Sequence, residues 1–451
     1  MAEQTSGGRA GGEAGGTVNQ TDIPPELSGP SPATGGRAFR FLLCTAAAEG
    51  VGDAVTRTVF PILAVAVLGM GPGFVGALNA VGIAAFVLLG VPIGAMVDRR
   101  RRPGSAMGAA SLLRCLALLV LAAAAFSGWL SAPLLAGVAV LIGVADVVFT
   151  TAQTTLIPVV SDGRGLKHAY SRLAVTGQAT SAGAAAGAGA GLALLGMPLV
   201  LAATAAVYAL SRLFQLGLPR SVDREAFPGA EQGDKPGDAQ GAREGGGRRR
   251  GPGRLGFALL RNSPPLRSLT LSACLTNAAA MVGNTVLPVY VLRDLALAPA
   301  LYAVLGVFGA AGAVLGAATA PRLSSRFGLS GTRSGAALLS VPAVLLVVAC
   351  TWLPGPEMLW LALEFLLWAF LVSVSAVAGS EVLPRTVPPG QLATVAAAQR
   401  TFTLGVMPPA ALLAGFLAAW AGMVPVFCLW VLLAGTAAVP ILRTGALRQF
   451  R

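Results

Sequence analysis

The sequence predicts an all-α membrane protein, with twelve transmembrane helices arranged as two pseudo-symmetric six-helix bundles. Three observations predict this fold class. Hydrophobic residues make up 55% of the chain and charged residues only 11%, whereas a soluble domain carries about 25% charged residues. Apolar runs of about 20 residues or more, the length needed to cross a bilayer, recur along the chain. A single long polar stretch separates these runs into two groups of equal number.

Each apolar run is a candidate spanning helix, and the short connections between most of them predict that neighbouring helices run antiparallel. The first group covers about 39–67, 74–97, 104–128, 132–159, 169–194 and 198–218. The second group covers about 267–292, 300–321, 334–353, 357–383, 392–419 and 423–442. Aromatic residues are few while Ala and Gly are abundant, so we expect the helices to pack through small side chains.

The segments between and outside the helices define five parts of the chain. Residues 1–36 are rich in Gly, Ser, Pro and Glu and lack the apolar core of a signal peptide, so we expect a disordered tail. The two bundles then cover 37–218 and 267–442, and residues 443–451 form a short tail. The polar linker 219–266 contains an amphipathic piece, 254–261, which either lies on the membrane surface or is simply solvated.

The distribution of Lys and Arg predicts the orientation of the chain. Most of them lie in the tails, in the linker and in the loops that follow even-numbered helices, while Arg293 stands alone among the opposite loops. By the positive-inside rule both termini and the linker are cytoplasmic, in the cell inner (plasma) membrane. The net charge of +13 thus reports orientation, and no nucleic-acid-binding pattern is present. The basic residues of the linker either contact membrane lipid or are solvated.

The two halves resemble each other. Residues 58–62 (TVFPI) match 285–289 (TVLPV) at an offset of 227, and 156–158 (LIP) match 382–384 (VLP) at an offset of 226. Both matches fall on equivalent helices that run in the same direction. This predicts a parallel repeat about an axis along the membrane normal.

The loop between the second and third helices resembles a motif of the major facilitator superfamily. That motif has a Gly, three residues, an Asp and then basic residues, and here it reads from Gly94 through Asp98 and Arg99 to Arg102. Arg101 stands where the motif has its second Gly, and the second-half counterpart at 316–322 has lost the acid. The resemblance implies the twelve-helix fold, alternating access and a cytoplasmic gate formed by Gly94, Asp98, Arg99 and Arg102.

Several shorter stretches resemble the twelve-helix exporters of the enterobactin exporter-like drug efflux group. They are Gly52-Asp53, Leu113-Arg114 and residues 256–267. The resemblance covers about residues 39–442 and names no substrate. It implies that the first, fourth, seventh and tenth helices line a central cavity.

Ionisable residues inside the predicted helices are the candidate site. Glu49, Asp53 and Arg57 are spaced four residues apart and share one face of the first helix. Glu49 and Asp53 lie about 15 and 21 Å from its cytoplasmic end. Because an ionisable side chain in the hydrocarbon core costs at least about 2.5–3.5 kcal/mol, this face must point into the bundle. The same reasoning adds two acids on other helices that the resemblance places around the cavity, Asp146 and Glu364, and the seventh helix adds the polar side chains of Asn277 and Asn284.

Three roles remain open for these side chains. They could relay protons, since burial raises a carboxylate pKa, with Asp146 favoured because Arg57 keeps Asp53 ionised. They could attract a cationic substrate. They could be structural, with Asp53 paired to Arg57 and Glu49 paired to Arg114 of the third helix.

No enzyme signature is present: we find no catalytic residues, no phosphate-binding loop, no metal-ligand spacing and a single His. We therefore expect no cofactor and no metal. The sequence predicts a monomeric secondary transporter that exports an amphipathic small molecule in exchange for protons. The alternatives are proton-coupled uptake of a nutrient and, from another class, a membrane receptor or scaffold that transports nothing.

Overall fold

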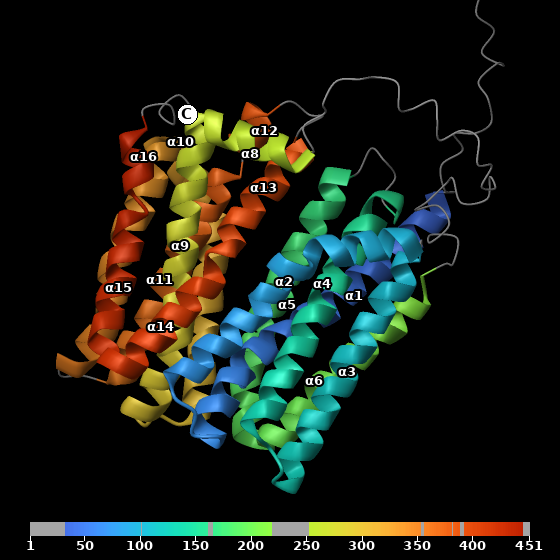
Figure 1. The fold of residues 1–451 in the computed structure, drawn as a ribbon, viewed down its shortest axis with the longest axis horizontal. Helices are drawn as coiled ribbons and strands as arrows, with labels where there is room; N and C mark the ends of the chain where they lie inside the picture. The colour runs from blue at the N-terminus through green and yellow to red at the C-terminus, as the bar shows by residue number, and fades with distance from the viewer. Residues whose placement is uncertain are drawn as a thin grey trace, which may run out of the picture.

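The computed structural model describes residues 32–100, 102–160, 166–218, 252–352, 356–380, 382–387 and 392–444. All regular structure in these ranges is helical (Figure 1). The expectations for residues 1–31, for the linker before 252 and for the tail after 444 lie outside the described residues. The first helix begins at Pro32, before the predicted tail boundary at 36.

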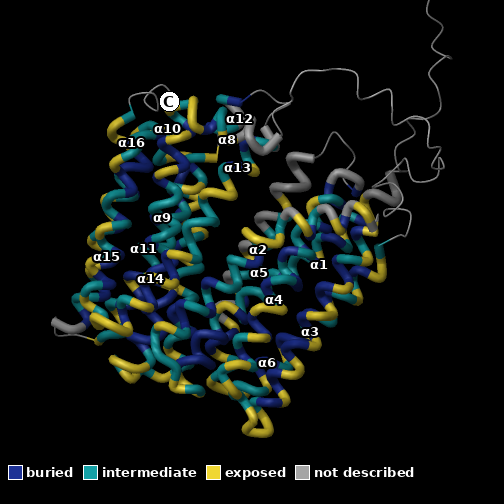
Figure 2. Tube along the Cα trace, viewed as in Figure 1, coloured by how far each residue is buried: buried dark blue, intermediate teal, exposed yellow. Residues whose placement is uncertain are grey.

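Six helices form the N-terminal bundle, and their bounds agree with the six predicted spans. They are α1 (Pro32–Ile62, continued by the π-helical turn η2, Leu63–Val67), α2 (Pro72–Arg100), α3 (Pro103–Ser127), α4 (Ala132–Val160), α5 (Leu166–Leu195) and α6 (Met197–Leu216). Their buried residues make two apolar clusters, one around Leu118 and one around Leu156. Figure 2 shows the buried positions of this bundle mainly where its helices face one another, with exposed positions on the outer surface.

The C-terminal bundle repeats this arrangement with more interruptions. Its elements are α8 (Pro252–Asn262), α9 (Pro264–Val289, continued by η3, Tyr290–Asp294), α10 (Pro299–Trp352), α11 (Glu357–Gly379), α12 (Val382–Thr386), α13 (Leu392–Gly405), α14 (Met407–Ala421), α15 (Met423–Thr436) and α16 (Val439–Arg443). The main buried cluster surrounds Trp430.

Prolines explain why two predicted spans are each divided in the structure. The span 392–419 breaks at Val406, before Pro408 and Pro409, and the span 423–442 breaks before Pro440. Proline lacks the N–H that continues a helix, so a helix breaks or kinks around it.

Within the described residues, ten helices are long and apolar enough to cross a membrane. One of them, α10, is two helices joined across Gly328, whose φ of 70° is far from helical, and these match the predicted spans 300–321 and 334–353. Helix α5, 30 residues long and rich in Ala and Gly, is not among the ten. Counting α10 as two helices and adding α5 gives the twelve predicted helices.

The two bundles pack most closely at one end, and Arg400 of α13 also lies 4.7 Å from the ring centroid of Phe86, near the middle of α2. Helices α6 and α8 meet the chain's linker at what we call the linker end; the opposite end is the far end. Figure 1 shows the bundles diverging toward the linker end, where α1 begins and α16 finishes. At the far end a Cβ on Gly76 of α2 would lie 2.5 Å from the carbonyl of Ala411 in α14. A Cβ on Gly189 of α5 would lie 3.0 Å from Val304 of α10.

The same π-helical turn occurs in both bundles at the far end, as the sequence repeat predicts. In η2 the N–H of Leu68 donates to Leu63 O at 3.0 Å, and in η3 the N–H of Leu295 donates to Tyr290 O at 2.9 Å. Each residue of the second pair lies 227 positions after its counterpart, the offset of the TVFPI and TVLPV match. Both turns follow an in-helix proline, Pro61 or Pro288.

The amphipathic piece of the linker is helical, and part of its apolar side packs on the C-terminal bundle. Leu260 is buried in a cluster with Leu269 and Val395, and Phe257 packs edge-to-face on Phe402 at 5.2 Å. These contacts place Leu260 and Phe257 against α9 and α13, and the membrane-surface position of α8 stays a prediction.

Candidate functional site

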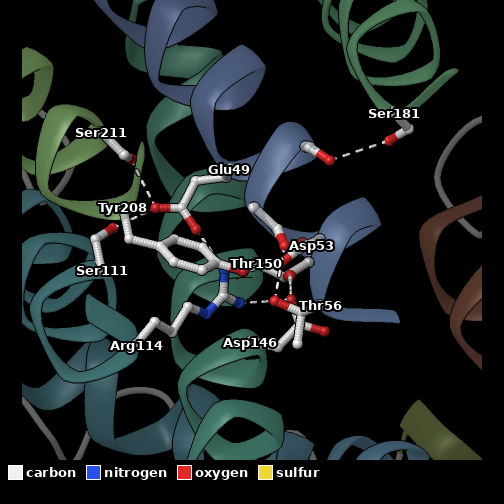
Figure 3. Close-up of polar contacts among 12 residues, drawn as sticks. Glu49, Asp53, Thr56, Ser111, Arg114, Asp146, Thr150, Ser181, Tyr208 and Ser211 are labelled. Carbon is white, nitrogen blue, oxygen red and sulfur yellow. Dashed lines mark hydrogen bonds and ion pairs between the residues drawn. The ribbon is translucent and has the colours of Figure 1, made fainter. Parts of the chain in front are cut away.

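A single arginine at the centre of the N-terminal bundle binds three carboxylates (Figure 3). Arg114 Nη1 pairs with Glu49 Oε2 and, at 3.2 Å, with Asp53 Oδ1. Its Nη2 pairs with Asp146 Oδ1 at 2.8 Å. Arg114 has no exposed side-chain area. We call these four residues the Arg114 cluster.

Three helices bring the cluster together. Glu49 and Asp53 are four residues apart on α1 and project from one face toward α3, which carries Arg114, and α4, which carries Asp146. The guanidinium also lies 5.4 Å from the ring centroids of Phe149 and Tyr208. A planar guanidinium with several donors suits this position, because it can serve several carboxylates while stacking on aromatic rings.

Glu49 is the most enclosed of the three acids. Besides Arg114 it accepts hydrogen bonds from Ser111 Oγ at 2.5 Å and from Ser211 Oγ at 2.6 Å. Gln215 Nε2 in turn donates to both hydroxyls, at 2.8 and 3.2 Å. Three donors hold this one carboxylate in place. Glu49 therefore acts as the fixed counter-ion of Arg114.

The two aspartates are more accessible. The exposed side-chain fraction is 4% for Glu49, 25% for Asp53 and 44% for Asp146. Asp53 also accepts a hydrogen bond from Tyr208 Oη at 2.7 Å. The Tyr208 ring comes this close to α1 because Gly52 has no side chain; a Cβ there would lie 2.5 Å from the ring. Solvent, a proton or a ligand can therefore reach Asp53 and Asp146 more readily than Glu49.

The predicted pairing of Glu49 with Arg114 is present, but the predicted pairing of Asp53 with Arg57 is wrong. Within the described ranges, the ion pair of Asp53 is with Arg114, and Arg57 is exposed one turn further along α1. Spacing along one helix permits a contact at four residues. Here the donors from α3 and α6 occupy the Asp53 carboxylate instead.

The other predicted cavity residues lie in the C-terminal bundle. Asn277 donates to the carbonyl of Thr403 in α13 at 2.9 Å, so its amide joins two helices. The side chain of Asn284 is exposed. Glu364 is 1% exposed, and its Oε2 has no hydrogen-bond partner. None of the three contacts the Arg114 cluster, so their predicted cavity roles rest on their helices alone.

The predicted cytoplasmic gate falls at the end of α2. Gly94, Asp98 and Arg99 are helical, and Arg102 is the exposed N-cap of α3. Gly94 faces α4, since a Cβ there would lie 3.9 Å from Thr151. The side chain of Asp98 lies outside the described residues, so the gate remains a prediction.

Sequence reasoning missed the contribution of α6. Tyr208, Ser211 and Gln215 recur at helical spacing on one face of an otherwise apolar helix, and all three are buried. That spacing could have indicated a polar face toward the bundle interior. Among the described residues no group of three His, Cys, Asp or Glu side chains is placed to hold a metal ion. Arg114 occupies the space between the three carboxylates.

Comparisons with known proteins agree with the fold. A profile described as Major Facilitator Superfamily matches residues 42–409. No curated protein matches the chain.

Solved structures similar in fold include three transporters. A bacterial homologue of the iron transporter ferroportin in an inward-facing state has a TM-score of 0.67 at 17% identity, covering 92% of this chain and 99% of that one. The nucleoside transporter NupG has a TM-score of 0.64 at 16% identity, covering 92% and 100%. A bacterial homologue of the human lysosomal transporter Spinster, inward-facing and unoccupied, has a TM-score of 0.58 at 16% identity, covering 92% and 95%.

These identities are low, so the structural likeness establishes the shared all-helical architecture and leaves the substrate open. The family match spans most of the chain, including α1 with the acids and the α2–α3 connection with the loop motif. With its two pseudo-symmetric bundles, the chain belongs to the Major Facilitator Superfamily.

Proposed function

We propose that the protein is a secondary transporter that exports an amphipathic, positively charged small molecule in exchange for protons. It works as a monomer in the plasma membrane, with the linker end cytoplasmic. The observation that carries this proposal is the charge of the Arg114 cluster. Three carboxylates surround one guanidinium, so the cluster has a net charge of −2 when all four groups are ionised.

This excess of negative charge favours the binding of cations by the cluster. Charges held away from bulk water interact strongly, and an uncompensated one costs several kcal/mol. Glu49 is committed to Arg114 by its two serine hydroxyls. The excess negative charge therefore resides on Asp53 and Asp146, which are partly exposed. A proton on either carboxyl, or a cationic substrate beside it, relieves the imbalance.

Competition for the same carboxylates supplies the coupling. Proton and substrate do not both bind when each neutralises the same charge, so loading one favours release of the other. Exchange then follows if the cluster opens alternately to the two sides of the membrane. The observed form, closed at the far end and separated toward the linker end, suits one of these two states (Figure 1).

Transport in everted membrane vesicles tests the proposal. Vesicles energised by a proton gradient should accumulate a fluorescent amphipathic cation. Asp146→Asn and Asp53→Asn should each lower the rate at least tenfold while the protein remains folded, because Asn keeps the shape of Asp. Glu364→Gln tests the buried acid of the C-terminal bundle in the same assay.

Three outcomes would decide against it. Unchanged transport in both Asp variants would exclude these carboxylates as the coupling site. Proton-driven accumulation of a nutrient by intact cells would favour uptake. A protein that binds a partner but moves no solute in either assay would be a receptor or scaffold.

A further inference from the structure

A backbone carbonyl in α9 is freed by a proline and bound by the other bundle. Pro288 has no N–H, so the carbonyl four residues earlier, that of Asn284, lacks its helical donor. Asn79 Nδ2 of α2 donates to this carbonyl at 3.3 Å and to Thr285 Oγ1 at 3.4 Å. These hydrogen bonds cross from the N-terminal to the C-terminal bundle at the far end.

Glycine brings the two helices within reach of each other. A Cβ on Gly76, about one turn before Asn79, would lie 2.5 Å from the carbonyl of Ala411 and 3.3 Å from Thr285 Cγ2. Neither contact leaves room for a side chain. Asn79 therefore lies at the seam where α2, α9 and α14 meet, next to a small buried cluster that includes Ala411.

The N-terminal bundle has an equivalent carbonyl freed by a proline, but it lacks the equivalent hydrogen bond from the other bundle. Pro61 frees the carbonyl of Arg57 in the way that Pro288 frees that of Asn284, with the same offset of 227. The residue 227 positions after Asn79 is Gly306, which has no side chain to donate. In the described part of the chain, Thr58 Oγ1, the counterpart of Thr285 Oγ1, bonds only its own helix, at Ala54 O.

We propose that Asn79 is the latch that holds the far end closed, by donating across the bundles to the carbonyl that Pro288 frees. Opening the far end separates α2 from α9. This removes the donor that α2 contributes to that carbonyl, so the latch stabilises the closed form and not the open one. Asn79 thereby sets the balance between the two access states, beyond its helix's role in packing.

The expected size of the effect follows from the worth of such bonds in membranes. Hydrogen bonds between membrane helices average about 0.6 kcal/mol, which corresponds to about a threefold change in an equilibrium. Asn79→Ala should therefore raise the open fraction of the far end about threefold. Thr285→Val, which keeps the Asn284 carbonyl, should raise it by less.

Thiol labelling from the far side measures that fraction. A cysteine is placed at Ala411, which is fully buried at the seam, in a chain whose five native cysteines are replaced. A membrane-impermeant thiol reagent is added to intact cells. The labelling rate is proportional to the open fraction, whether or not any substrate is known. Gly76→Ala, whose Cβ clashes with the carbonyl of Ala411, is the positive control for opening.

Matched variants distinguish the loss of the latch from a general loosening of the helix packing. Thr58→Val makes the same change as Thr285→Val at the equivalent place and should leave the rate unchanged. A cysteine at Ala205, buried in the N-terminal core, should label equally slowly in all variants. The latch is disproved if Asn79→Ala labels at the wild-type rate, or if Thr58→Val or the Ala205 reporter shows the same increase. Because this readout needs neither substrate nor protons, it stands apart from the test of export.

Discussion

The centres of the two bundles occupy equivalent positions but differ in content. The N-terminal centre is filled by an arginine, three carboxylates and an aromatic ring, whereas the C-terminal centre is a small hollow lined by hydroxyls, apolar residues and Trp368. The equivalent pairs, at offsets of 227, 226 and 226, are Glu49 with Thr276, Arg114 with Ser340, and Tyr208 with Ala434.

The repeated fold therefore carries charged side chains at the centre of one bundle and small side chains at the centre of the other. The N-terminal bundle concentrates buried charges and stabilises them with a dense hydrogen-bond network. The C-terminal bundle places small side chains at the same positions, so it has no charges to compensate there. Its own buried ionisable groups, Arg333 and Glu364, lie on different helices, and Arg333 bonds a backbone carbonyl, that of Ser375.

Removing the arginine should have the largest effect. Arg114→Met leaves the three carboxylates without their shared counter-ion, and breaking a buried pair in this way costs about 3–5 kcal/mol. We expect the purified protein to unfold at a markedly lower temperature and transport to be lost. A melting temperature within a degree of wild type would show that the cluster does not hold the N-terminal bundle together.

Removing one hydroxyl should have a smaller effect. Tyr208→Phe keeps the ring against Gly52 and Arg114 but deletes the 2.7 Å hydrogen bond to Asp53. Hydrogen bonds to charged groups contribute about 1.5–3 kcal/mol. We expect reduced thermal stability and slower transport, since Asp53 loses one of its two partners. A loss of stability with an unchanged rate of transport would limit Tyr208 to packing.

The buried acid of the C-terminal bundle should matter less still. Glu364 Oε2 has no hydrogen-bond partner, so exchanging this carboxyl for an amide breaks no hydrogen bond at that oxygen. Glu364→Gln keeps the shape of the side chain, and proton-driven transport should stay within twofold of wild type. A loss of transport as large as that in Asp146→Asn would mean that the C-terminal bundle also carries a proton.

The smallest change is expected at the counterpart of Arg114. Ser340 Oγ donates to the carbonyl of Ala337 in its own helix, and its side chain borders the hollow. Ser340→Ala should alter stability by no more than about 0.5 kcal/mol, as for sites without special interactions. Thermal unfolding alongside Arg114→Met would measure the contrast directly. A large loss at Ser340 would show that the two centres are more alike than their residues suggest.

The sequence by itself determined the number, order and direction of the helices, because about 20 apolar residues are a physical requirement for crossing a bilayer and polar segments cannot enter it. It also showed that Glu49 and Asp53 must face inward, since their helix face cannot contact lipid. The offset of 227 located the repeat that the twin π-helical turns display.

Only the tertiary structure decided which partners those residues have. Helical spacing predicted Arg57 as the partner of Asp53, but the way α3 and α6 pack against α1 places Arg114 and Tyr208 beside Asp53 instead. No local sequence pattern encodes that packing. The sharing of one guanidinium among three helices, and the reach of Asn79 to a carbonyl on another bundle, have the same origin. Contacts between helices distant in sequence depend on how the whole set of helices packs, whereas helix length and inward-facing charge follow from each segment's own interaction with the membrane.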